Sequence, residues 1–149
     1  VVRLGIEVTA LPVVHFSARG LTDRNVTLWA GFALKGQRSG GSLIHFEGDY
    51  GSIYRRIGQE YGPFDIALTA VGAYEPREIM KGYHCSLDDC VQAAIDLKAN
   101  NIIPVHWGTT VLGTEDIYET GEEFRKKALS KGIPEERIWI MKIGETRIF

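Results

Sequence analysis

The sequence has 149 residues, the length of one ordinary domain, with the 44% hydrophobic and 24% charged residues of a soluble globular protein. Its formal net charge is −2 at pH 7, which gives no basic surface for nucleic acid, so no nucleic-acid partner is expected. No run of residues approaches the roughly 18 consecutive apolar positions that a membrane-spanning helix needs.

The chain begins without an initiator methionine, on residues 1–8, which are rich in apolar and β-branched side chains. We therefore expect it to be the later part of a longer protein. Cys85 and Cys90 lack a C-x-x-C spacing, and positions five apart on a helix do not share a face, so we expect free thiols. Free thiols suit a reducing compartment, and we expect a cytoplasmic location, with peripheral attachment to a membrane left open for the full-length protein.

The first third of the chain has the pattern of a β meander. A strand is predicted over residues 6–15, with Pro12 interrupting it, and a second over residues 26–34. Glycines and polar residues in 35–42 predict a hairpin connection to a third strand over 43–46.

The remainder alternates between strands and helices. Ser52 can cap one helix, and Ser86 with Asp89 resembles a capping box for another. This alternation predicts an α/β (α+β) fold, a mixed sheet with helices on one face and a second layer that this chain need not contain. The expected elements are a helix over 53–61, a strand over 66–71, a loop over 72–77, a helix from about 86 to about 100, a strand over 102–105, a helix over 121–130 and strands over 138–143 and 146–149.

His106 follows the short apolar run 102–105, where the chain turns out through Gly108. Chemistry in α/β sheets gathers at the carboxyl ends of strands, and a histidine there can act as a metal ligand or a general base. Taken alone, His106 is better explained as a half-buried histidine that bonds a neighbouring carbonyl group.

Two further strand ends carry groups that can bind a metal. His15 follows the apolar residues 11–14, and Asp49 follows residues 44–48. Two imidazoles and a carboxylate suit Zn²⁺, Fe or Mn²⁺, and the two oxygens of Asp49 can bridge two metals about 3.5–4 Å apart. The three residues lie far apart in the sequence, so their spacing alone is a weak signal.

Longer segments of the chain carry a resemblance. The sequences Gly-Ala-Tyr-Glu-Pro-Arg at 72–77 and His-Trp-Gly-Thr at 106–109, in that order, resemble the metallo-β-lactamase superfamily. The branch they resemble contains N-acylphosphatidylethanolamine-hydrolysing phospholipase D, its bacterial relatives and the ascorbate-6-phosphate lactonases. The resemblance covers nearly the whole chain, and its other segments are 15–17, 21–31, 48–49, 62–65, 80–81 with His84, and 144–145.

This resemblance implies an αββα sandwich with a dinuclear metal site between two sheets. Carried over residue by residue, it makes His15 a metal ligand, Asp49 the bridging carboxylate and His106 the last ligand of the second metal. It places His84 beside the site, where it would orient the substrate or protonate a leaving group, so that His84 and Asp49 are the candidate catalytic residues. Two Zn²⁺ ions per complete site are expected, with Mn²⁺ or Fe as alternatives.

One large departure concerns the His-x-His-x-Asp-His motif, which supplies most of the ligands in the superfamily and is absent here. The only other histidine is His45, to which we assign no role. Residues 1–149 therefore match the C-terminal half of the fold and hold only part of the ligand set. Tyr50, where the branch usually has threonine, and Glu47, where a small residue is common, put the geometry of the Asp49 loop in question.

The resemblance implies a metal-dependent hydrolase that cleaves a phosphodiester bond, as a phospholipase D does, or a lactone or ester bond, in a small-molecule or lipid substrate. The isolated chain is expected to be inactive because its site is incomplete, and its exposed apolar sheet face would favour a dimer. One alternative is a nuclease of the same superfamily, which the net charge of −2 disfavours. Another is a non-catalytic α/β binding domain that has lost its metals.

Two side-chain types near the candidate site have a structural explanation as well as a functional one. Trp29 and Trp107 are more often core residues than substrate platforms, and Trp107 is expected to form a wall of the site while packing. Arg77 could form a structural ion pair or hold a phosphate group through two hydrogen bonds.

Overall fold

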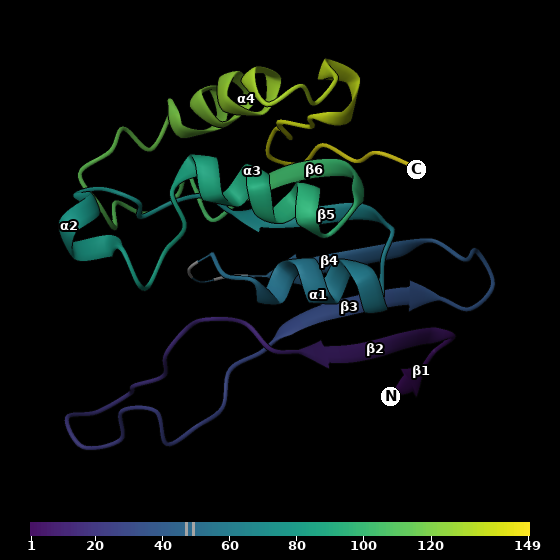
Figure 1. The fold of residues 1–149 in the computed structure, drawn as a ribbon, viewed down its shortest axis with the longest axis horizontal. Helices are drawn as coiled ribbons and strands as arrows, with labels where there is room; N and C mark the ends of the chain where they lie inside the picture. Colours follow the sequence, from purple (N-terminus) through teal and green to yellow (C-terminus); the bar gives the residue numbers. More distant parts are fainter. Residues whose placement is uncertain (47, 49) are drawn as a thin grey trace.

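The computed structural model describes residues 1–46, 48 and 50–149. In this described part, six strands form one mixed sheet in the order β1-β2-β3-β4-β5-β6 (Figure 1). The first four strands pair antiparallel, whereas β4, β5 and β6 run parallel. The strands are β1 (Val2–Arg3), β2 (Ile6–Leu11), β3 (Gly31–Gly36), β4 (Ser42–Phe46), β5 (Phe64–Ala70) and β6 (Ala99–Val105).

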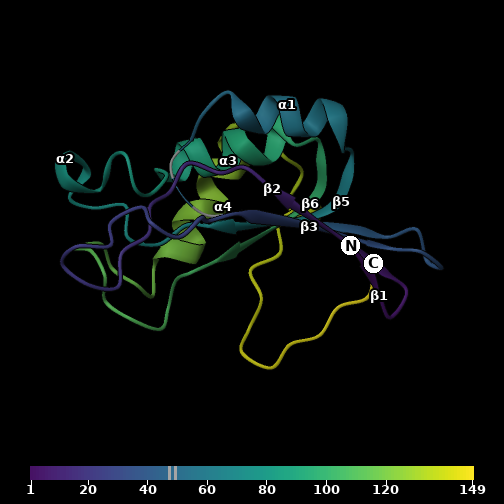
Figure 2. The same ribbon diagram turned by 90° about the horizontal axis from the view of Figure 1, so that it is seen from below.

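Helices cover one face of this sheet. Helices α1 (Ile53–Glu60) and α3 (Leu87–Asp96) lie on that face, and α4 (Thr120–Ser130) packs against α3 (Figure 2). The short helix α2 (Arg77–Met80) lies in the connection between β5 and α3, and a 3-10 turn, η1 (Glu135–Arg137), follows α4. The predicted mixed sheet with helices on one face is confirmed. In the described part of the chain, no helix is both long and apolar enough to cross a membrane.

Strand register explains which residues form the core. Ala33 pairs with Ile44, Ile44 with Ala67 and Ala67 with Ile102, so these four side chains form one row across the sheet. All four are buried in the main hydrophobic cluster, against the helices. Successive side chains of a strand point to opposite faces, so the adjacent row must lie on the other face.

The opposite face of the sheet is apolar and only partly covered. Its row consists of Phe32, His45, Leu68 and Ile103, which are paired across neighbouring strands. Phe32 is 46% exposed, and the buried Nδ1 atom of His45 has no hydrogen-bond partner among the described residues. We call this surface the open face.

Most of the predicted elements are confirmed. Strand β4 and helices α1 and α4 begin and end within two residues of the predicted bounds. Ser86 and Asp89 form the predicted capping box, with a hydrogen bond in each direction. Ser52 occupies the N-cap of α1, but its side chain makes no capping hydrogen bond, so that part of the prediction is wrong.

Five segments differ from the prediction. The second strand starts at Gly31, so residues 26–30 are irregular, and α3 ends at Asp96 because β6 begins at Ala99. The predicted loop 72–77 leads directly into α2. The predicted strands 138–143 and 146–149 are irregular segments apart from one bridge between Ile138 and Ile102.

A carboxylate at the start of β5 ties that strand to β4. Asp65 accepts hydrogen bonds from the backbone nitrogen and the hydroxyl group of Ser42, at 2.8 and 3.0 Å. The backbone hydrogen bond from Ser42 is the main cause that lowers the pKa of Asp65 below its ordinary value of 3.8. The ionised form is therefore the one that stabilises the fold.

Replacing Asp65 with asparagine should reduce the free energy of unfolding at pH 7 by about 1 kcal/mol, because the hydrogen bonds lose their charged acceptor. A lowered carboxyl pKa contributes stability above the unfolded-state value, and this contribution disappears as the pH falls through the folded-state value. Urea denaturation at pH 7 and pH 3 measures the effect. The difference between the two proteins should be smaller at pH 3 than at pH 7; an equal difference at both values would contradict the account.

Candidate metal centre

Three of the four histidines form a cluster at the carboxyl ends of the parallel strands. His15 follows the isolated bridge residue Val14, His106 follows β6, and His84 lies between α2 and α3. The ring centroids of His15 and His84 are 6.2 Å apart, and those of His84 and His106 are 5.6 Å apart. Thus the structure brings together three side chains that the sequence separates widely.

The backbone around Gly48 packs against the segment that carries His15. A Cβ atom on Gly48 would lie 1.9 Å from the Val14 carbonyl oxygen and 3.4 Å from the His15 Cβ, and the φ angle of Gly48 is +110°. Only glycine fits such a close approach at a positive φ. The Cys85 thiol also donates a hydrogen bond to the Gly48 carbonyl, at 2.8 Å. Gly48 therefore joins the segments that carry His15 and His84.

The hydrogen bond of His15 leaves one ring nitrogen for a ligand. The Nδ1 atom lies 2.8 Å from the carbonyl oxygen of Phe16, which can only accept. The proton of the neutral ring is therefore assigned to Nδ1, and Nε2 carries the lone pair. A histidine that binds a metal through one ring nitrogen commonly donates the N–H of the other to a carbonyl group. This hydrogen bond fixes the tautomer and the orientation of the ring.

The backbone of His106 is unusual. Its φ angle is +66°, in the left-handed region, where a residue with a side chain costs on the order of 1 kcal/mol. A Cβ atom on Gly72 would lie 2.0 Å from the His106 carbonyl oxygen, so the chain leaving β5 packs directly on His106. This close packing compensates for the strained conformation and fixes the point at which the His106 side chain leaves β6.

Arg77 fixes the segment that carries His84. Its Nη1 atom donates to the His84 carbonyl oxygen at 2.6 Å, and its Nη2 atom lies 3.5 Å from the Asp89 carboxylate. Asp89 belongs to the capping box of α3. Of the two explanations considered for Arg77, these contacts support the structural ion pair.

Asp49 and Glu47 lie outside the described residues, so the predicted bridging carboxylate has no described geometry. The neighbouring Tyr50 donates its hydroxyl hydrogen to Asp96 at 2.7 Å. This hydrogen bond is the main cause that raises the pKa of Tyr50. The Tyr50 side chain is thus anchored to the end of α3.

The two cysteines are free, buried thiols. Burial raises the pKa of Cys90 well above its ordinary value, and the adjacent Cys85 thiol adds to this shift. Cys85 and Cys90 lie close together in the structure. The argument from helical spacing does not apply to them, because Cys85 precedes α3. The Cys90 thiol donates a hydrogen bond to the Ala70 carbonyl oxygen at 3.2 Å, which gives it a structural role.

The described side chains supply only part of a possible metal site. Among residues 1–46, 48 and 50–149, no group of three or more His, Cys, Asp or Glu side chains is close enough to hold an ion. The chemistry nevertheless fits a metal: His15 has its proton on Nδ1 and its lone pair on Nε2, and His106 lies on a strand end that is fixed by close packing. These described histidines suit part of a ligand set.

Trp107 packs against the core, as predicted. Its indole nitrogen donates to the Pro104 carbonyl at 3.0 Å, and a Cβ atom on Gly121 would lie 2.4 Å from its ring. A cavity of about 240 Å³ opens beside His106 and Trp107 and is also lined by Thr109, Thr110 and Leu112.

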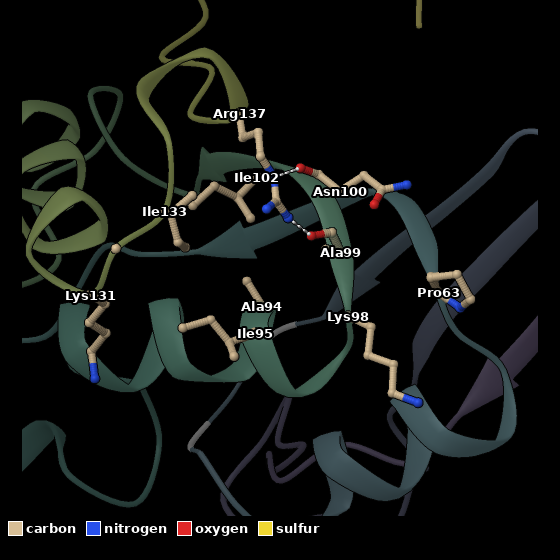
Figure 3. Close-up of a pocket in the computed structure, with 11 residues that line it drawn as sticks. Pro63, Ala94, Ile95, Lys98, Ala99, Asn100, Ile102, Lys131, Ile133 and Arg137 are labelled. Atoms are coloured by element: carbon tan, nitrogen blue, oxygen red, sulfur yellow. Dashed lines mark hydrogen bonds between the residues drawn. The ribbon is translucent and has the colours of Figure 1, made fainter.

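A second cavity, of about 490 Å³, lies at the other end of β6 and contains three cationic side chains (Figure 3). Lys98 and Lys131 lie just after α3 and α4, where positive charge complements the carbonyl groups of a helix end. Arg137 donates to the carbonyl oxygens of Ala99 and Asn100. Lys131 also pairs with Asp88 at 3.7 Å. This cavity lies a strand's length, roughly 20 Å, from His106.

Comparison with known proteins agrees with this architecture. A family model described as a beta-lactamase superfamily domain matches residues 1–107. N-acyl-phosphatidylethanolamine-hydrolyzing phospholipase D 1 of Caenorhabditis elegans is 40% identical over 116 residues, which cover 76% of this chain and 32% of that protein. The mitochondrial N-acyl-phosphatidylethanolamine-hydrolyzing phospholipase D of Saccharomyces cerevisiae is 32% identical over 146 residues, covering 95% and 31%. The chain thus spans about a third of the length of these two relatives.

A similar fold occurs among solved structures. Igni18, a metallo hydrolase from Ignicoccus hospitalis, superposes with a TM-score of 0.69 at 21% identity. The match covers 95% of this chain and 52% of that one. At this identity the similarity is one of fold.

Proposed function

Because this chain belongs to the beta-lactamase superfamily domain family, we propose that it is the C-terminal half of a metallo-β-lactamase αββα sandwich. The chain covers only about a third of the length of the two relatives, and its open face is apolar. Both observations support this proposal. A layer of the same architecture would cover Phe32 and the other residues of that face. The complete protein would then be a metal-dependent hydrolase.

The observation that carries the function is the histidine cluster at the strand ends. In our proposal, His15, Asp49 and His106 hold a dinuclear centre together with ligands from elsewhere in the complete protein. Two Zn²⁺ ions are the expected occupants, with Mn²⁺ or Fe as alternatives. When bound, the ions would polarise the scissile bond and activate water near neutral pH. Asp49 would serve both metals through its two oxygens.

His84 would act on the substrate side of the centre. Its ring neighbours both other histidines, while its backbone is fixed by Arg77. From there it can donate a proton to a leaving oxygen or hold the substrate in position.

A phosphodiester bond in a lipid or another small molecule is the proposed target, because the Caenorhabditis and yeast relatives carry the name of a phospholipase D. A lactone or ester is the second candidate. The net charge of −2 argues against a nuclease. The presence of His15, Asp49 and His106 together argues against a non-catalytic domain.

Location and assembly complete the proposal. A cytoplasmic location, with peripheral membrane attachment of the complete protein, would give access to a lipid substrate. If the 149-residue chain is isolated, its open face would be unprotected, and we expect it to dimerise through Phe32 and the neighbouring apolar side chains.

The test compares the product of the complete reading frame with the 149-residue chain alone. Both are purified with added Zn²⁺ or Mn²⁺ and assayed on an N-acylphosphatidylethanolamine in mixed micelles and on a simple lactone. The complete protein should hydrolyse the phosphodiester, whereas the chain alone should show little turnover and weak metal binding. Enzyme-like turnover by the chain alone, with two tightly held metals per monomer, would contradict the half-site proposal.

A further inference from the structure

The loop between β2 and β3 is irregular but well fixed by hydrogen bonds. The carboxylate of Asp23 accepts from the backbone nitrogens of Arg19 and Gly20, at 3.1 and 2.7 Å. The backbone nitrogen of Asn25 donates to the Ser17 carbonyl oxygen at 2.7 Å. These bonds fix the turn 23–25 and hold the backbone of Arg24 in place.

The Arg24 side chain lies over two aromatic rings. Its guanidinium carbon is 5.2 Å from the centre of the Phe16 ring and 6.0 Å from that of Tyr83. Its Nη2 atom donates to the Tyr83 hydroxyl at 3.4 Å, and the two rings themselves meet edge to face at 5.2 Å. Arginine stacks well on such rings because its guanidinium is planar and weakly hydrated.

Both rings belong to residues that directly follow or precede a histidine of the cluster. Phe16 follows His15 and stacks on its ring at 5.1 Å, with an interplanar angle of 2°. Tyr83 precedes His84. Arg24 therefore lies at the rim of the candidate metal centre, in contact with the aromatic neighbours of His15 and His84.

Among the residues that the structure describes, no acid matches the charge of Arg24. Among the described residues, no carboxylate forms an ion pair with Arg24, and the adjacent Asp23 is engaged by backbone N–H groups. A guanidinium has five N–H donors, of which the contact with Tyr83 uses one. A fixed and exposed arginine with spare donors suits an oxyanion, which it can bind through two hydrogen bonds.

We propose that Arg24 binds an anionic group of the substrate, a phosphate or carboxylate, that lies away from the bond being cleaved. The inference rests on the proposed function, because it assumes a substrate in the His15–His84–His106 cluster. The guanidinium contacts the residues next to His15 and His84, so the group it binds would lie beside the reacting atoms. Arg24 thus selects the part of the substrate that projects from the centre, such as a free phosphate or the headgroup of an anionic lipid.

The experiment uses the product of the complete reading frame and two p-nitrophenyl phosphodiesters of ethylene glycol. One ends in a free hydroxyl group and the other in a phosphate monoester. Arg24→Ala should raise KM for the phosphate-ended substrate about tenfold, the effect of losing one charge-assisted contact, and leave KM for the hydroxyl-ended substrate within about twofold. Arg24→Lys should recover part of the loss, because the charge remains but the two-pronged geometry does not.

Arg19→Ala is the matched control, since it removes a cation from the same loop while keeping the backbone contact of residue 19 with Asp23. It should change neither KM. Equal losses for both substrates in Arg24→Ala, with a lowered melting temperature, would show that Arg24 only attaches the loop to Tyr83 and would overturn the inference. Unchanged KM values would overturn it as well. Repeating the comparison with both substrates carrying an acyl chain in neutral micelles distinguishes a lipid headgroup from a soluble phosphate.

A binding measurement separates this inference from the proposed reaction. The Arg24 Nε–H signal is followed by NMR while 2-hydroxyethyl phosphate is added, with Arg24→Lys used to assign the signal. A saturable shift of that signal without any phosphodiester turnover would support anion binding and contradict the proposed function. Turnover without a shift of the Arg24 signal would contradict anion binding and leave the proposed function standing.

Discussion

Replacing His84 with alanine should lower kcat of the complete enzyme by about 10²–10⁴-fold, the range expected when a general acid is removed. The bound metal should remain, because we assign the ligand role to His15 and His106. His84 is assigned a role on the substrate because its ring centroid lies 6.2 Å from that of His15 and 5.6 Å from that of His106. Steady-state kinetics and metal analysis on the same preparation measure both quantities.

The control for His84→Ala is His45→Ala, which removes a histidine from the open face instead of the cluster. It should preserve kcat. If His84→Ala keeps normal turnover, the proposed substrate-side role is wrong. If it loses metal together with activity, His84 is a ligand and the assignment of roles within the cluster must change.

Replacing Gly72 with alanine should destabilise the protein by about 1–3 kcal/mol and reduce metal binding. The added Cβ would lie 2.0 Å from the His106 carbonyl oxygen and 3.2 Å from its Nδ1 atom. The first contact is with backbone and cannot be relieved by rotating a side chain. The chain at His106 must therefore move, and its imidazole with it.

Urea denaturation and metal titration of Gly72→Ala, compared with Gly20→Ala, measure this effect. A Cβ on Gly20 meets no atom nearer than 3.7 Å, so that substitution should change the unfolding free energy by less than about 0.5 kcal/mol. Equal stability and equal metal affinity of the two variants would contradict the close packing described here.

Elements with local signals were predictable from the sequence. The capping box of Ser86 and Asp89 needs only four consecutive residues, and it starts α3 where predicted. The apolar run before His106 likewise predicts β6, because a buried parallel strand needs apolar side chains on both faces. His15 and His106 follow from the ends of such runs, whereas a role for His84 came only from the family resemblance.

Features that depend on distant contacts were not predictable. Residues 26–30 have an alternating pattern, yet β3 begins only at Gly31, where a Cβ would lie 2.9 Å from Val13 and 3.0 Å from the His45 carbonyl oxygen. The segment 138–143 has strand propensity but forms only a single bridge, with Ile102. Propensity cannot decide such segments because pairing partners determine whether a strand forms. The position of Arg24 was missed for a similar reason, since Tyr83 lies 59 residues away.

The most direct test of the account is the metal content of single-histidine variants of the complete protein. After dialysis against Zn²⁺-free buffer, the wild type and His45→Ala should each retain two metal ions per chain, the number that a bridging carboxylate site holds. His15→Ala and His106→Ala should each retain one or fewer. Two metals in all four proteins, or none in the wild type after reconstitution with Zn²⁺, would contradict the claim that His15 and His106 belong to a metal centre.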